Sequence, residues 1–342
     1  MKSHFATLFS VLVYVLKNNY LIYIYFLIPV LVKDYKNVSF LAPLIFIPIS
    51  ILLLFLLPKK VGEINYVNIL KRTTIVKMSY YTVQLLLMVL NIVLVSYTIR
   101  EMFFYDENIL FFIVSSLAVT VFISNNKTEV IFNSSSFLLL SAIILIVIPV
   151  FLANEVKDFS LLMPLNEFKG YSFLLIFYFV FDAISILLSG AKINKKITKW
   201  NLFIPILIML VFMSLEVMNL IIITGDTYLI DNEFLGFFTI FIQDTINYIG
   251  NLGLIFLYVI PVVGCFKSGY CLRRIKEGLN IKSNLFFNII LFIILFFLIY
   301  AIIYFIDIPM FSFYTILIST VLLFVVYVFI IVNRSPNYEI KF

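Results

Sequence analysis

Long apolar blocks alternate with short polar segments along almost the whole chain. A helix needs about 20 mostly apolar residues to cross the hydrocarbon layer of a bilayer. By that rule the pattern predicts about ten membrane-spanning helices. They are expected near residues 5–32, 38–57, 78–100, 108–124, 135–153, 171–190, 202–224, 245–266, 284–306 and 309–332.

Two segments depart from a simple span. Lys17, Asn18 and Asn19 interrupt the first apolar block, and each half of that block is too short to cross alone, which predicts a broken helix. Residues 234–266 would extend about 50 Å as one helix, which is too long for a single crossing. We therefore expect 234–242 to lie flat at the outer membrane surface and to lead into span eight.

Composition supports a membrane protein. Of the 342 residues, 63% are hydrophobic and 12% are charged, and the mean hydropathy is +1.14. No water-soluble core of this size could bury so much apolar surface, so lipid must be the solvent for most side chains. We expect one transmembrane domain over residues 1–342.

The basic residues predict the orientation of the spans. With the N-terminus in the cytoplasm, 18 basic residues fall in cytoplasmic segments and five in outer ones, which is the asymmetry of the positive-inside rule. Both termini are then cytoplasmic. The net charge of +6 serves orientation in this distribution, so we expect no nucleic-acid partner. Ten spans also permit an inverted repeat of five and five helices, over residues 1–153 and 170–332, without showing one.

Two charged groups lie deep in predicted spans. Lys17 is about 18 Å along the first span, beside Asn18 and Asn19. Asp182 is in the middle of span six. An ionisable group at such depth indicates a ligand or ion site, because burying an unpaired charge is costly. The alternatives are a Lys17 side chain that extends to the interface and an Asp182 that only hydrogen-bonds two helices together.

Two further acids are candidates. Glu216 lies toward the outer third of span seven and belongs either to the site or to a polar seam. Gln243, Asp244, Asn247 and Asn251 recur at helical spacing and share one face. That face either lines the site or caps span eight at the membrane surface.

Span three carries a polar stripe of Gln84, Asn91, Ser96 and Tyr97. The stripe could line a solute pathway, with Tyr97 as a binding residue, although buried amides also join neighbouring helices.

Signatures of enzymes and metal sites are absent from the sequence. There is no glycine-rich phosphate loop and no Ser, His and Asp constellation, and His4 is the single histidine. Cys265 and Cys271 fit reduced cytoplasmic thiols better than a disulfide. We expect no catalytic activity, no cofactor and no bound metal.

Four segments resemble the spore germination permease family, a branch of the amino acid, polyamine and organocation transporters. They are Val95–Met102 (VSYTIREM), Lys127–Leu140 (KTEVIFNSSSFLLL), Asp158–Leu165 (DFSLLMPL) and Phe179–Lys196. Within the last segment, Asp182 stands where the family usually carries a glutamate.

The resemblance implies a ten-helix inverted-repeat fold that binds an amino-acid-like nutrient in a central cavity. Such a protein would sense germinants together with a larger membrane subunit and a lipoprotein, in the bacterial cell membrane or the inner membrane of a spore. In that picture Asp182 meets the ligand amino group, and backbone amides near Asn18 and Asn19 meet its carboxylate. The competing hypotheses are an ion-coupled amino acid transporter and a structural subunit of an envelope complex.

Overall fold

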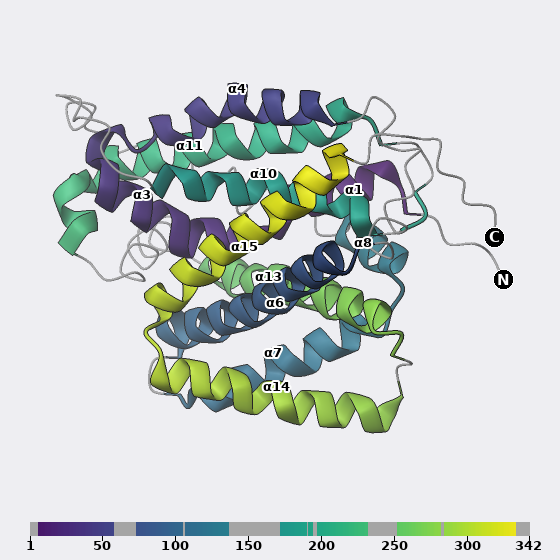
Figure 1. Ribbon diagram of the computed structural model, residues 1–342. Helices are drawn as coiled ribbons and strands as arrows, with labels where there is room; N and C mark the ends of the chain where they lie inside the picture. The colour runs from purple at the N-terminus through teal and green to yellow at the C-terminus, as the bar shows by residue number, and fades with distance from the viewer. Residues whose placement is uncertain are drawn as a thin grey trace.

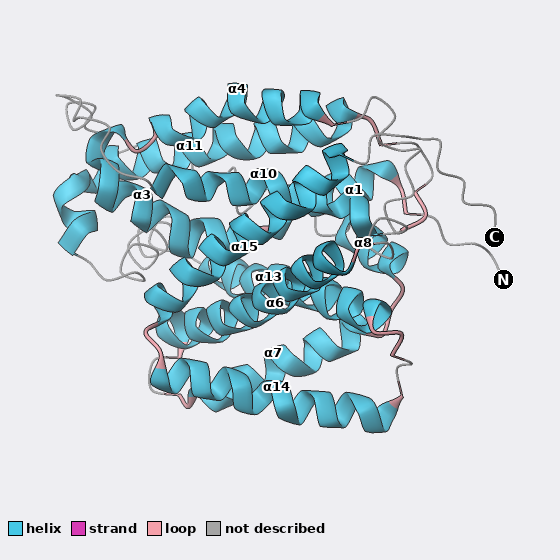
Figure 2. Cartoon of the chain, viewed as in Figure 1, coloured by secondary structure: helices cyan, strands magenta, loops and turns pink. Residues whose placement is uncertain are grey.

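In the computed structural model, helices joined by short loops make up the part of the chain that is described (Figures 1 and 2). It describes residues 6–57, 73–104, 107–136, 172–189, 191–193, 197–231, 252–281 and 284–332. Within these ranges there is no strand, and a single isolated bridge pairs Ala6 with Ile193. The predicted all-α class is confirmed.

The elements follow the predicted order. They are α1 (Leu8–Asn18), α2 (Tyr20–Ile22), the π-helical η1 (Tyr23–Leu27), α3 (Ile28–Tyr35), η2 (Lys36–Val38), α4 (Leu41–Leu56), α6 (Thr74–Phe103), α7 (Ile109–Ser124), α8 (Thr128–Ser136), η5 (Ser172–Leu175), α10 (Ile176–Ser185), η6 (Ile186–Ser189), α11 (Lys199–Asp231), α13 (Leu252–Gly278), α14 (Leu285–Phe305) and α15 (Ile308–Val332).

The helices have the lengths and composition of a membrane protein. Among the described residues, four helices are long and apolar enough to cross a bilayer, or six if each of two bent helix pairs is one span. The most apolar stretch of α6 is 78% buried by the rest of the chain, whereas that of α14 is 17% buried. Helix α6 is therefore central, and α14 presents most of its apolar surface outward, as a helix facing lipid does.

Helix α13 packs closely against α6 and α7 in the middle of the assembly (Figure 1). Two glycines allow the approach: a Cβ at Gly264 would overlap Val95 and lie 2.6 Å from Leu21 Cδ1, and one at Gly269 would lie 2.5 Å from Ile123. The hydroxyl of Ser268 donates to the Met88 carbonyl of α6 at 3.3 Å. Small residues thus set the spacing of these helices, as in many membrane bundles.

The helix formed by the first apolar block is broken where the sequence predicts it. Helix α1 ends at Asn18, Asn19 leaves helical geometry at φ −108° and ψ 8°, and α2 begins at Tyr20. The break is narrow, because the Asn19 N–H still donates to the Lys17 carbonyl. The π-helical turn η1 comes next and ends two residues before Pro29. Proline has no N–H and its ring is bulky, so it disturbs the regular helical hydrogen bonds there.

Span eight differs from its prediction at one end. The sequence placed its cytoplasmic limit at residue 266, but α13 continues to Gly278 as regular helix. Residues 267–278 therefore pack within the helix assembly and do not form a basic loop. The predicted span at 135–153 and the predicted surface helix at 234–242 lie outside the described residues, apart from the last turn of α8.

Substituting Gly264 tests the close approach of α13 to α6. Gly264→Ala should lower the unfolding free energy by about 1–2 kcal/mol, since the clash with stiff, β-branched Val95 outweighs the gain in helix propensity. Thermal unfolding in detergent measures the loss. In the double variant with Val95→Ala the loss should be smaller than the sum of the two single losses, whereas strict additivity would contradict the contact.

Candidate functional site

The carboxylate of Asp182 is the meeting point of three segments. Its Oδ2 accepts hydrogen bonds from Lys267 Nζ of α13 at 2.8 Å, Asn19 Nδ2 at 2.8 Å and Asn18 Nδ2 at 3.2 Å. Asp182 is 2% exposed and Lys267 is 1% exposed. A buried carboxylate with three donors, one of them charged, is compensated as such groups must be.

Asn19 is held on both sides of its amide. While Nδ2 donates to Asp182, Oδ1 accepts a hydrogen bond from the Tyr178 hydroxyl at 2.9 Å. Tyr178 and Asp182 are one turn apart on α10, so the amide of Asn19 spans one face of that helix. The two bonds fix which way the amide points.

The break in α1 makes this arrangement possible. Side chains of consecutive residues in a regular helix point about 100° apart, so Asn18 and Asn19 would not normally reach one oxygen atom. The departure at Asn19 turns both amides toward α10. The break predicted in the first apolar block therefore faces Asp182, and the contact is made by the side-chain amides of Asn18 and Asn19.

Lys17 lies in the same region, and none of the described residues supplies a counter-ion to it. Its side chain is 1% exposed, its Nζ has no hydrogen-bond partner among the described residues, and it lies 4.9 Å from the centre of the Phe266 ring. It does not extend to the interface, which was the alternative predicted for it, and it does not bond to Asp182.

Lys267 is the partner that the sequence analysis missed. It was counted among the cytoplasmic basic residues because it directly follows the predicted end of span eight. A signal was present: Gly264, Cys265, Ser268 and Gly269 surround Lys267 with small side chains that permit tight packing. Such a neighbourhood is unusual for a solvated loop and typical of a helix interface.

Glu216 and Tyr97, the other candidates within the described residues, are not among the hydrogen-bond partners of Asp182. Glu216 is buried on α11, three residues past Met213, whose carbonyl accepts a bond from Tyr23 of η1. Tyr97 is half-buried on α6, about two helical turns beyond the level at which Ser268 bonds to Met88. Asp244 and its polar face lie outside the described residues.

The polar stripe of span three faces the protein interior. Gln84, Asn91 and Ser96 are fully buried. The amide nitrogen of Asn91 donates to the Leu87 carbonyl in its own helix at 2.7 Å. Neither amide atom of Gln84 has a partner among the described residues.

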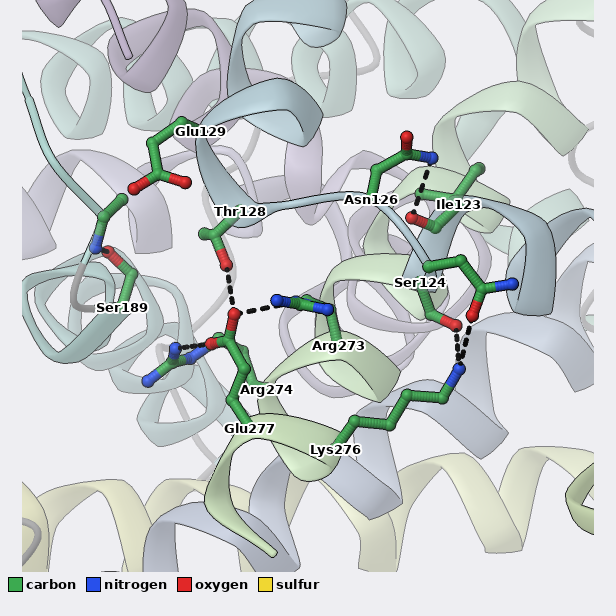
Figure 3. A network of polar contacts seen from close by, with 12 residues as sticks. Ile123, Ser124, Asn126, Thr128, Glu129, Ser189, Arg273, Arg274, Lys276 and Glu277 are labelled. Carbon is green, nitrogen blue, oxygen red and sulfur yellow. Dashed lines mark hydrogen bonds and ion pairs between the residues drawn. The ribbon is translucent and has the colours of Figure 1, made fainter. Parts of the chain in front are cut away.

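A second polar network lies at the end of the assembly that carries Arg273, Arg274 and Lys276, which we call the basic end (Figure 3). Glu277 accepts from Arg273 at 2.7 Å, from Arg274, and from Thr128 of α8 at 3.4 Å. Figure 3 shows these side chains converging on the Glu277 carboxylate.

Arg274 and Lys276 extend this network to neighbouring helices. Arg274 Nη2 donates to the Leu188 carbonyl of η6 at 2.8 Å. Lys276 Nζ donates to Ser124 at 2.8 Å, to Asn125 at 2.9 Å and to Asn288 of α14 at 3.0 Å. The last turns of α13 thus join α7, α8, η6 and α14 at the basic end.

The described residues contain no group of three or more His, Cys, Asp or Glu side chains that could hold a metal ion. Both cysteines are buried and free. What the central cluster offers is a set of hydrogen-bond donors and acceptors in an apolar interior. That chemistry suits a small polar ligand held by hydrogen bonds and charge.

In comparisons with known proteins, no family model matches the chain and no curated protein matches it.

Replacing each asparagine by leucine of similar volume tests the central cluster. Asn19→Leu should lower the unfolding free energy by about 2–4 kcal/mol, because it removes one bond to a buried carboxylate and leaves the Tyr178 hydroxyl unpaired. Asn18→Leu is the matched control, with about 1–2 kcal/mol expected from its single, longer bond. Equal losses in thermal unfolding would contradict the geometry.

Proposed function

We propose that this chain is a membrane-embedded binding protein for a small, amino-acid-like nutrient, held at the break of the first span against α10 and α13. The observation that carries the proposal is the convergence of Asn18, Asn19 and Lys267 on one oxygen of Asp182. A ligand at this point touches three segments that the chain brings together from far apart in sequence.

The free-energy cost of burying the charged groups of this cluster supports a role beyond packing. Replacing a buried ion pair by well-packed apolar residues is often neutral or stabilising. Apolar side chains could therefore hold these helices together at a lower cost in free energy. Ionisable groups inside membrane proteins commonly mark ligand or ion sites. The Lys267–Asp182 pair and Lys17 are three such groups in one region.

The proposal includes the finer architecture expected from the sequence. We propose ten spans, two inverted repeats over residues 1–153 and 170–332, and both termini in the cytoplasm. In that scheme the break of α1 and Asp182 belong to the first spans of the two repeats. Transporters built in this way bind their substrates where those broken spans meet.

The resemblance to spore germination permeases refines the role. We propose that the chain is the polytopic, nutrient-sensing subunit of a germinant receptor, working with a larger membrane subunit and a lipoprotein. A ligand shifts such a protein only if it binds one conformation better than another. A site at the break in α1 meets that condition, because relative movement of α1, α10 and α13 would change its donors.

A second candidate is an ion-coupled amino acid transporter. The Lys267 ammonium occupies the side of Asp182 where a cation would otherwise be attracted, at 2.8 Å. A carboxylate that exchanges an internal cation for an external one could couple solute movement to an ion gradient. Uptake into proteoliposomes that depends on such a gradient would favour the transporter over the sensor.

The binding role predicts stabilisation of the purified chain by its ligand. Across a panel of amino acids, one or a few should raise the melting temperature, equivalent to about 2.7 kcal/mol at a hundred times Kd. Asp182→Ala and Asn19→Ala should remove the response, since each disrupts the arrangement at the break. Arg273→Gln, at the part-exposed basic end, should retain it.

Two outcomes would contradict the proposed binding site. A ligand response that persists unchanged in both Asp182→Ala and Asn19→Ala would place the site elsewhere. No response to any member of the panel, with or without the partner subunits, would favour a structural subunit.

A further inference from the structure

Lys17 is a buried cation that the cluster around Asp182 leaves without a carboxylate. Its Nζ is 4.9 Å from the centre of the Phe266 ring and has no hydrogen-bond partner among the described residues. A desolvated cation over an aromatic ring gains about 2 kcal/mol. Burying an ammonium group costs several kcal/mol, so the ring alone does not compensate the charge.

The neighbouring carboxylate is already engaged. Oδ2 of Asp182 takes all three described bonds, including the ion pair with Lys267. Lys17, Lys267 and Asp182 together carry a formal charge of +1, so the described residues of this cluster are one negative charge short of balance.

None of the described acids forms a hydrogen bond or ion pair with Lys17. Glu216 lies on α11 near Met213, which bonds to Tyr23 of η1 and not to the break itself. Glu277 is engaged by Arg273 and Arg274 at the basic end. The aromatic side chains that line the cluster, Tyr14 and Tyr178 among them, carry no formal charge.

The residue that follows Lys17 in the chain carries an unpartnered acceptor. Oδ1 of Asn18 is buried and has no hydrogen-bond partner among the described residues, while Nδ2 of the same amide donates to Asp182. The break of α1 therefore presents a cation at Lys17 and a neutral acceptor at Asn18. A carboxylate next to an ammonium group is the small-molecule chemistry that complements this pair.

We infer that Lys17 binds the carboxylate of the ligand and that Oδ1 of Asn18 accepts a hydrogen bond from its amino group, while Asp182 stays paired with Lys267. This inference rests on the proposed function. It keeps the ligand carboxylate at the break of α1, as expected from the sequence, but moves the amino group from Asp182 to Asn18. The free carboxylate becomes the required feature of the ligand.

The test compares each amino acid that raises the melting temperature with its α-amide, which lacks the carboxylate. The amide should bind at least tenfold more weakly to the wild-type chain. Lys17→Met should bind the amino acid at least tenfold more weakly, and its unliganded melting temperature should equal or exceed that of the wild type, because an uncompensated buried charge is removed.

Lys199→Met is the matched control. Lys199 also lies over an aromatic ring, 5.9 Å from the centre of Phe55, but it donates to the Phe55 carbonyl at 2.9 Å. It lies away from the break and should leave ligand binding unchanged. Equal binding of acid and amide, or wild-type affinity in Lys17→Met, would overturn the inference while leaving the proposed binding function intact.

Acetate provides a probe that does not depend on knowing the ligand. Added to the wild-type chain, acetate should raise the melting temperature in a saturable way relative to chloride at equal ionic strength, and Lys17→Met should lose that gain. If acetate acts through Lys17 and no amino acid binds, the carboxylate site at Lys17 stands, whereas the proposed function and the amino-group contact at Asn18 fail. If neither acetate nor any amino acid acts through Lys17, the inference is wrong.

Discussion

An ionised carboxylate in an apolar interior must be surrounded by donors, and the arrangement at the centre of this protein follows from that constraint at Asp182. Three donors come from two stretches of chain that lie far from Asp182 in sequence, the break of α1 and the middle of α13. Both must stay against α10 for the charge to be compensated. The narrow break at Asn19 and the close approach at Gly264 serve that end.

The sequence predicted those features that depend on local pattern. Apolar blocks indicated the helices, and the polar interruption at Lys17, Asn18 and Asn19 indicated the break. Depth in the membrane singled out Asp182. The partners of Asp182 could not be predicted, because they depend on how far each neighbouring helix continues and on which of its faces packs inward. Lys267 looked like the first residue of a basic loop until α13 proved to continue to Gly278.

The two polar networks differ in how deeply their charged groups are buried. At the basic end, Arg273 and Glu277 are part-exposed, and pairs of that kind contribute little to stability. In the centre, Lys267 and Asp182 are almost fully buried, and removing either partner leaves the other uncompensated. Lys17 is a third buried ionisable group in this centre, and it has no partner among the described residues.

The coupling energy between Asp182 and Lys267 tests the central claim most directly. Unfolding free energies of Asp182→Asn, Lys267→Met and the double variant form a double-mutant cycle. The account predicts that each single change costs about 3–5 kcal/mol and that the double change costs at least about 2 kcal/mol less than their sum. Additivity within about 0.5 kcal/mol would show that the two groups do not depend on one another, and would contradict the account.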